Sequence, residues 1–337
     1  MVERSGLGID IKYEEDSVLG YKVVHPGDYV IHLRSFQGGF AFSEKTGICS
    51  PAYTILQPSS SLSYGFLKNY FVSKKFINSL RIVTYGIRDG KSISVEEWLK
   101  LSTCFPKSLE EQQRIKSFLS LLDKRISLQN KVIERYKSLI RAIIHNLNSS
   151  ANNHALLREL LTERKELNSS GLEICSVSVT KGVINQVDYL GRSFAAKDTV
   201  KYHVVKSGDI VYTKSPTGDF PYGIIKQSRL EDPVAVSPLY GVYEPRTFEI
   251  GTYLHYYFCS PENTRNYLRK LIQKGAKNTI NITNQHFLDN SICIPNRESL
   301  AKGIAAIDAI SKRIKDEESY GQLLLRQKHH LLMNLFI

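Results

Sequence analysis

The length and charge of this sequence limit what it can encode. With 337 residues, the chain is too long for one ordinary hydrophobic core and suits about two domains. It has 45 Lys and Arg against 33 Asp and Glu, a formal net charge of +12. This surplus favours a polyanionic partner such as DNA, RNA or an anionic membrane, although a protein can also be basic without one.

Other totals exclude several classes of protein. No apolar run approaches the roughly 18 residues that span a bilayer. The opening residues, MVERSGLGID, lack the basic-then-apolar pattern of a signal peptide, so we expect a cytoplasmic protein. The five cysteines are scattered and form no Cys-x-x-Cys pair, so the sequence predicts neither a disulfide framework nor a zinc site.

In chain order, the first predicted elements are two strands joined by a Gly-Asp turn, in YKVVHPGDYVIHL at 21–33. The Ser-Pro at 50–51 precedes another apolar run, which indicates a further strand, and a helix is predicted around 64–80. Pro106 closes this β-rich part. We expect a first globular domain at 1–106.

A long helix comes next, and with its linker we expect it to occupy 107–150. Ser108 is placed to cap its first turn, which is acidic. Apolar residues alternate four and three positions apart, the 3.5-residue period of a coiled-coil seam, with Gln129 as the one polar member. A core helix of a bundle is the alternative. The apolar seam residues are Ile115, Leu119, Leu122, Ile126, Ile133, Tyr136, Ile140, Ile143 and Leu147.

The remainder of the chain repeats this plan. The offset between matches grows from 181 residues (21 to 202) to 189 (106 to 295), as expected where loops differ in length. So long an ordered series indicates that one large unit has been duplicated. The matches pair 21–33 with YHVVKSGDIVYTK at 202–214, CSPAYTILQP at 49–58 with VSPLYGVYEP at 236–245, NYFVS at 69–73 with YYFCS at 256–260, STCFP at 102–106 with NSICIP at 290–295, and KRI at 124–126 with KRI at 312–314.

The second copy therefore predicts a globular domain at 151–294, with a helix around 250–273, and a second long helix at 295–337. The seam of this helix is less regular, because Glu317, Gly321 and Lys328 stand at seam positions. We expect the two long helices to pair as an antiparallel coiled coil. The apolar seam residues predicted in the second helix are Ile307, Ile310, Ile314, Leu324, Leu331 and Leu335.

Two pairs of loops have the chemistry of DNA contacts. In the first pair, Arg34 suits a guanine edge or a phosphate, Gln37 suits an adenine edge, and glycines at 38–39 allow close backbone approach. The second copy has Lys214 at the matching loop. For each residue a phosphate or structural contact is the alternative to base readout. The candidates in this pair are Arg34, Ser35, Gln37, Lys214, Ser215 and Thr217.

The second pair of loops precedes a strand-like run in each copy and keeps positive charge in both. Loops of this kind can carry function on a rigid scaffold, although an ordinary solvated turn has the same composition. The candidates for DNA contact are Arg88 and Lys91 in the first copy and Lys274, Lys277 and Asn278 in the second.

The sequence contains no motif of an enzyme that acts on DNA. It has no Pro-Pro dipeptide of an amino-methyltransferase, no GxxxxGK[ST] loop, no GxSxG and no HExxH. Adjacent His329 and His330 do not share a helix face and have no third ligand in view, so we predict no metal site. We expect a non-catalytic protein without a cofactor.

The motif series resembles the specificity subunit of type I restriction–modification enzymes over nearly the whole chain. The resemblance rests on GIRDGKSISVEEWLKLSTCFPKSLEEQQRIKSFLSLLDKRISLQNKVIERYKSLI, and on VVHPGDYVIHLRSFQGGF and VVKSGDIVYTKSP. It implies an α+β fold in which two target-recognition domains are separated by two long antiparallel helices in a pseudo-twofold repeat. It also implies double-stranded DNA, two methyltransferase subunits and endonuclease/translocase subunits as partners, and a two-part DNA target.

One departure from this pattern concerns the opening of the first copy. The second copy has the segment HALLRELLTERKELNSSGLEICSVSVTKGVINQ before its VVKSGD, whereas only about twenty residues precede VVHPGD. The sequence thus predicts a shortened first recognition domain, by truncation, by design or by a misassigned start. Two alternatives to the main interpretation stay open: a truncated or recombinable specificity module, and a coiled-coil adaptor that does not read DNA.

Overall fold

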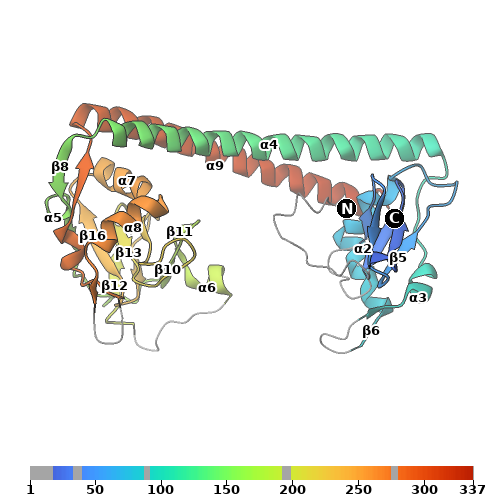
Figure 1. The fold of residues 1–337 in the computed structure, drawn as a ribbon, viewed down its shortest axis with the longest axis horizontal. Coiled ribbons are helices and arrows are strands. Elements are labelled where there is room, and N and C mark those ends of the chain that lie inside the picture. Colours follow the sequence, from blue (N-terminus) through green and yellow to red (C-terminus); the bar gives the residue numbers. More distant parts are fainter. Residues whose placement is uncertain (1–17, 33–39, 87–91, 192–198, 275–279, 337) are drawn as a thin grey trace. The chain divides into compact units, whose positions relative to one another are not determined.

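The computed structural model describes residues 18–32, 40–86, 92–191, 199–274 and 280–336 (Figure 1). It divides into two compact units. Unit 1 comprises Met1–Ile133 and Asp316–Ile337, and unit 2 comprises Glu134–Lys315. Each long helix contributes one part to each unit.

Unit 1 contains a three-stranded antiparallel sheet in the order β3-β2-β5 and two smaller strand pairs. An aromatic core covers the sheet, with Phe40, Phe71 and Trp98 in edge-on or tilted contacts. The strands are β1 (Lys22–Val24), β2 (Tyr29–His32), β3 (Ala41–Phe42), β4 (Gly47–Cys49), β5 (Tyr53–Leu56), β6 (Thr84–Tyr85) and β7 (Ser92–Ile93).

The single helix predicted around 64–80 is wrong. The structure has two 3-10 turns, η3 (Phe66–Lys68) and η4 (Tyr70–Val72), before α2 (Lys74–Ser79) and the 3-10 turn η5 (Leu80–Val83). Ser73 interrupts the helix because its backbone is extended and its hydroxyl accepts a hydrogen bond from the Phe76 N–H. The short helix α3 (Val95–Leu99) follows.

Unit 2 has a larger sheet in the order β14-β13-β16-β9. The helix predicted around 250–273 is also split, into α7 (Phe248–Tyr257) and α8 (Pro261–Arg269), with Ser260 capping α8 and Pro261 at its first turn. The other elements are β8 (Asn153–Leu156), α5 (Leu157–Leu160), β9 (Leu161–Glu163), β10 (Cys175–Ser178), β11 (Gly182–Asn185), α6 (Gln186–Leu190), β12 (His203–Val205), β13 (Ile210–Tyr212), β14 (Ile225–Gln227), β15 (Val234–Val236), β16 (Gly241–Pro245), β17 (Gln273–Lys274), β18 (Ile280–Asn281), η7 (His286–Asp289) and β19 (Ser291–Ile294).

The strand registers of the two units repeat one another. In unit 1, Lys22 lies opposite Cys49, and in unit 2 the matching His203 lies opposite Val236. Tyr29 pairs with both Phe42 and Leu56, as Ile210 pairs with both Gln227 and Tyr243. The duplication read from the sequence is therefore also a duplication of backbone pairing.

Within unit 1, the start of α4 (Leu109–Ser149) packs antiparallel against the end of α9 (Arg297–Asn334). Gln129 Nε2 donates to the Glu317 backbone oxygen (3.0 Å) and to its carboxylate (2.5 Å). Lys328 Nζ lies 2.5 Å from Asp123 Oδ1. Two polar residues in the α9 seam, Glu317 and Lys328, therefore each contact a polar side chain of α4. Gln129 and Glu317 are equivalent in the repeat, 188 residues apart like the KRI triplets (124 to 312).

Within unit 2, the end of α4 packs against the start of α9, and Leu147 approaches the backbone at Gly303. Buried Ile140, Leu147, Ile304 and Ile307 belong to the main core of the unit. Of the predicted seam residues along both helices, those that are buried are Leu119, Leu122, Ile133, Ile140, Leu147, Ile307 and Leu324. Those that are half-buried are Ile115, Ile126, Tyr136, Ile143, Ile310, Ile314, Leu331 and Leu335.

The fold is thus α+β, with two β-rich units of repeated design and two long helices that pair antiparallel within each unit. Among the described residues, no helix is both long enough and apolar enough to cross a membrane.

Candidate nucleic-acid interface

The first pair of predicted contact loops connects equivalent strands. The β2–β3 connection of unit 1 holds Arg34, Ser35 and Gln37, which lie outside the described residues. The β13–β14 connection of unit 2 holds Lys214, Ser215 and Thr217 and is described in full.

The β13–β14 loop has a tight base and an exposed tip. Thr217 and Phe220 exchange two backbone hydrogen bonds (3.1 and 2.9 Å) around the exposed pair Gly218-Asp219. The Phe220 side chain is buried beneath this turn. Gly223 closes the base, because a Cβ there would lie 1.8 Å from the Thr213 oxygen. A rigid base with a displayed polar tip suits contact with a large ligand.

Ser215 and Thr217 are exposed at this tip, and Lys214 is half-buried below it. Burial lowers the pKa of the Lys214 ammonium, while the nearby Glu163 carboxylate raises it. Glu163 also accepts a hydrogen bond from Asn284 Nδ2 (2.9 Å). A partly desolvated cation at the root of a polar loop is suited to a phosphate, because its attraction for an anion is less screened than in bulk water.

Sequence reasoning missed Glu163 and Asn284. Asn284 follows β18 closely, so it links the second predicted hairpin to the carboxylate that acts on Lys214. Its Oδ1 is buried and has no hydrogen-bond partner among the described atoms. No sequence signal distinguishes these two residues, because their relation arises only when β9 and β18 approach β13 in the fold.

The second pair of predicted loops lies at two hairpins, β6–β7 and β17–β18. Lys274 is the last residue of β17. Arg88 and Lys91 in unit 1, and Lys277 and Asn278 in unit 2, lie outside the described residues. Each of these predicted loops therefore connects two paired strands. The contacts of the side chains at the loop tips stay predictions.

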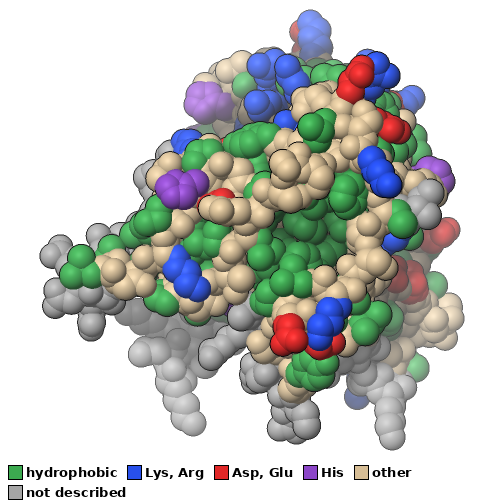
Figure 2. Space-filling model, turned by 90° about the vertical axis from the view of Figure 1, so that its right-hand side faces the viewer, with side chains coloured by type: hydrophobic (Ala, Val, Ile, Leu, Met, Phe, Trp, Pro, Cys, Tyr) green, Lys and Arg blue, Asp and Glu red, His purple; other side chains and the backbone are tan. Residues whose placement is uncertain are grey.

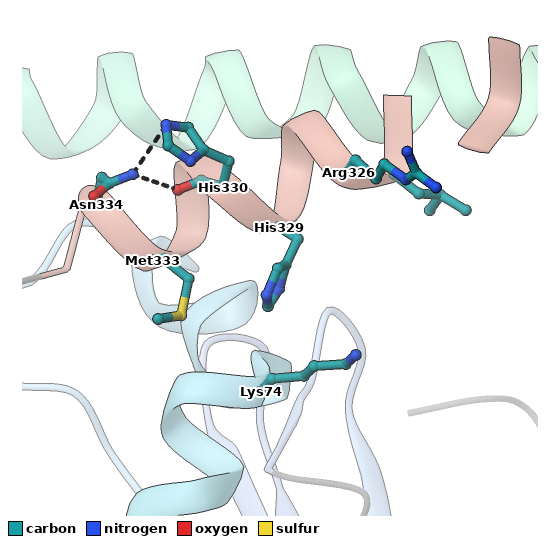
Figure 3. A pocket seen from close by; sticks show the side chains of 7 residues that line it. Lys74, Arg326, His329, His330, Met333 and Asn334 are labelled. Atoms are coloured by element: carbon teal, nitrogen blue, oxygen red, sulfur yellow. Dashed lines mark hydrogen bonds between the residues drawn. The ribbon is translucent and has the colours of Figure 1, made fainter. Parts of the chain in front are cut away.

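The paired histidines lie in an open pocket of unit 1 (Figure 3). The Asn334 side-chain amide donates a hydrogen bond to the His330 backbone oxygen at 2.9 Å. The His329 side chain points toward Lys74 (Figure 3). No group of three His, Cys, Asp or Glu side chains that would hold a metal ion occurs in the part of the chain that the structure describes. The pocket is lined by Lys74, Leu325, Arg326, His329, His330, Met333 and Asn334.

Comparison with known proteins gives matches in structure and not in sequence. No family model matches the chain, and no curated protein matches it. The type I restriction–modification S subunit from M. genitalium shares 14% identity, with 93% of this chain and 84% of that chain covered, at a TM-score of 0.53. A chain solved in work on complex assembly and conformational transition of the type I R-M system gives 14% identity, coverage of 93% and 82%, and a TM-score of 0.53. This chain therefore has the fold of type I restriction–modification specificity subunits.

Proposed function

We propose that this chain is the DNA-recognition subunit of a type I restriction–modification complex. The observation that carries the proposal is the duplicated scaffold, in which equivalent strands of both units present two candidate contact loops each, within the fold of specificity subunits. The net charge of +12 supports a polyanionic ligand.

In this proposal the chain performs no chemistry of its own. Each unit acts as a target-recognition domain and reads one half of a two-part double-stranded DNA target. The chain also recruits two methyltransferase subunits and, through the complex, endonuclease/translocase subunits. The described residues assigned to DNA are Lys214, Ser215, Thr217 and Lys274, with Lys214 on a phosphate.

Methylation mapping tests the function directly. The full chain is expressed with the methyltransferase encoded beside it, in a host without other DNA methylation, and modified bases are mapped by single-molecule sequencing. We expect a two-part motif with an unread spacer. A single half-motif would mean that one unit alone reads DNA. No methylation, with soluble chain and active methyltransferase present, would contradict the proposal.

Substitution of Lys214 tests the interface. Lys214→Ala should weaken duplex binding similarly on all sequences and reduce the slope of log affinity against log salt by about 1, because one phosphate contact is lost. Lys302→Ala is the matched control, since it removes one positive charge from an α9 side chain that is 77% exposed and paired with Glu298. Equal effects of the two variants would argue against a role for Lys214.

Salt dependence also separates this function from that of a coiled-coil adaptor. A DNA-recognition subunit should bind duplex DNA with affinity that falls steeply as salt rises. An adaptor whose basic charge is incidental should show weak binding without sequence preference.

A further inference from the structure

Unit 2 contains a lysine and a cysteine whose side chains touch. Lys226 lies in the middle of β14, and Cys259 lies at the corner between α7 and α8. Lys226 Nζ is 3.1 Å from Cys259 Sγ and donates a hydrogen bond to it. The two residues are 33 positions apart in the chain, so the packing of α7 beside β14 brings them together.

The Lys226 side chain lies in an unusual environment for an ammonium group. Lys226 is 4% exposed, and within the described part of the chain Cys259 Sγ is the only atom that accepts a hydrogen bond from its Nζ. Burial of an ammonium is unfavourable unless a negative group pairs with it. The thiolate form of Cys259 supplies that charge, because a thiolate accepts a hydrogen bond from a cation more strongly than a thiol does.

A histidine supplies a second donor to the same sulfur. Burial, with Lys226 and Arg229 nearby, lowers the pKa of His255 to about 3, so its ring is neutral in neutral solution. The Gln227 N–H donates to His255 Nδ1 at 3.1 Å, so the neutral ring carries its proton on Nε2. This Nε2 lies 3.8 Å from Cys259 Sγ. Two donors therefore face the sulfur.

The matching positions of unit 1 hold none of these three side chains. The residues that stand there are Ala41, Lys68 and Val72, in place of Lys226, His255 and Cys259. All three are exposed. Exposed apolar residues are frequent on unit 1, and Figure 2 shows hydrophobic side chains around a hollow on one face of it. The repeated fold thus forms without the thiol, the amine and the imidazole, so their joint presence in unit 2 indicates a chemical role.

We propose that Cys259 is a redox-sensitive modification site, at which hydrogen peroxide links the Cys259 sulfur covalently to the Lys226 nitrogen. Cys259 is half-buried, so a small oxidant can reach its sulfur, whereas Lys226 is enclosed beside it. The 3.1 Å between sulfur and nitrogen lies in the range of about 3–3.5 Å in which two groups are positioned to react.

The link forms in two steps. In the first, the Cys259 thiolate attacks one oxygen of hydrogen peroxide, so that an S–O bond forms and the O–O bond breaks. The hydroxide that leaves takes a proton from the Lys226 ammonium and becomes water. The sulfur is thereby oxidised by two electrons to a sulfenic acid, and the peroxide is reduced.

In the second step, the Lys226 amine attacks the sulfur of the sulfenic acid. An S–N bond forms, the S–O bond breaks, and the hydroxide that leaves takes a second proton from the nitrogen and becomes water. The product is a sulfenamide that ties β14 to the corner between α7 and α8. An excess of an added thiol cleaves the S–N bond and restores both side chains.

Mass spectrometry of the full chain tests the proposal. The chain is treated with hydrogen peroxide, its remaining thiols are alkylated, and the protein is digested. We expect a linked pair of peptides that contain Lys226 and Cys259. The mass of the pair should be lower by two hydrogens than the sum of the separate peptides, and dithiothreitol should separate them.

Cys293 is the matched control within unit 2. It is also half-buried, and its Sγ lies 3.5 Å from His154 Nδ1, but no described lysine contacts it. Cys293 should therefore form no link to a lysine.

Lys226→Met removes the nitrogen and keeps an unbranched side chain. The link should be lost, and alkylation of Cys259 in the untreated chain should slow at least about tenfold, because the thiolate loses its cation. Alkylation of Cys293 should be unchanged, which also reports that unit 2 of the variant is folded. If this variant folds poorly, the product formed in the unaltered chain still decides the proposal.

Oxidation of Cys259 to sulfinic or sulfonic acid without a link to Lys226 would overturn the proposal. A disulfide from Cys259 to another cysteine, or no oxidation of Cys259, would do the same. Linked peptides that carry one additional oxygen would rule out the direct S–N bond. An unchanged rate of Cys259 alkylation in a folded Lys226→Met chain would contradict the role of the ammonium.

Discussion

Matching positions in the two units hold an aromatic contact in one and a polar network in the other. In unit 1, the Phe42 ring lies against Gly65, where a Cβ would come within 3.2 Å of the ring. The matching pair in unit 2 is Gln227 and Thr252, and the Thr252 hydroxyl donates to Gln227 Oε1 at 3.2 Å. The same two backbone positions therefore hold different side chains in the two units. In unit 1 an aromatic ring packs on a glycine, and in unit 2 an amide accepts a hydrogen bond from a hydroxyl.

The polar network of unit 2 extends further. Gln227 Nε2 donates to the Gly208 oxygen at 3.1 Å, and the Gln227 N–H donates to His255 Nδ1 at 3.1 Å. Lys68, at the position of His255, is instead an exposed residue that pairs with Glu44. The same strand register therefore accommodates an aromatic or a polar core, provided that each buried polar atom finds a partner.

The largest expected difference between the units concerns Asp209 and Asp28. Asp209→Asn should destabilise unit 2 by about 3 kcal/mol, because Arg164 is only 13% exposed and loses its bidentate partner. Asp28→Asn should change the stability of unit 1 by less than about 1 kcal/mol, because an amide oxygen can still accept from the His25 N–H.

Urea unfolding can report the two units separately. Trp98 is the only tryptophan and packs, half-buried, against the core of unit 1, so its fluorescence reports unit 1. Hydrogen exchange in β13 and β16 reports unit 2. Equal losses from Asp209→Asn and Asp28→Asn would show that the Arg164 ion pair adds no stability to unit 2.

A pH-dependent difference is expected next. Burial, with Lys226 and Arg229 nearby, lowers the pKa of His255 from 6.5 to about 3. The unfolded chain therefore binds a proton below pH 6.5 that the folded state rejects, and stability falls as pH falls through this window. Between pH 7 and pH 5, unit 2 should lose up to about 2 kcal/mol, at about 1.4 kcal/mol per pH unit.

Hydrogen exchange of β14 and α7 at the two pH values measures this loss. His255→Gln should remove most of it, whereas Lys68→Gln in unit 1 should leave it unchanged. A loss of the same size in the His255→Gln chain would show that another group causes it.

Gly65→Ala tests the aromatic side of the comparison. Gly65 has φ of +71°, and a Cβ there would crowd Phe42, so unit 1 should lose about 2 kcal/mol. Gly171→Ala is the control in unit 2, because φ is +67° but nothing lies within 4 Å of a Cβ. Its loss should be about 1 kcal/mol, from backbone strain alone. Identical losses would mean that crowding against Phe42 contributes nothing.

The smallest effect is expected on α9. Gly321→Ala should stabilise unit 1 by up to about 1 kcal/mol, because alanine favours helix and a Cβ would meet Gln129 at an ordinary 3.6 Å. Gly303→Ala in unit 2 should gain less, because its Cβ would lie 2.7 Å from Leu147 Cδ1. Urea midpoints for the two variants measure this difference, and a larger gain at Gly303 would contradict it.

Sequence reasoning succeeded where a pattern is local or repeated. The 3.5-residue period predicted α4 and α9, because one helix face must be buried along its whole length. The duplication predicted the same internal plan in both copies, and the structure shows matching strand registers in the two units, because similar apolar alternation selects similar pairing. The continuous helices at 64–80 and 250–273 were wrong, because a serine cap at Ser73 and at Ser260 restarts the chain as a new helix.

The sequence by itself thus determined two β-rich units, two long helices and loops of DNA-binding character, because these follow from period, repetition and composition. Only the tertiary structure decided which polar groups meet. Arg164 binds Asp209 across 45 residues, and Gln129 binds Glu317 across 188. Such contacts depend on how strands and helices approach one another, and no local pattern encodes that approach. For the same reason, only the structure shows that Asp28 occupies the place of Asp209 without a described arginine beside it.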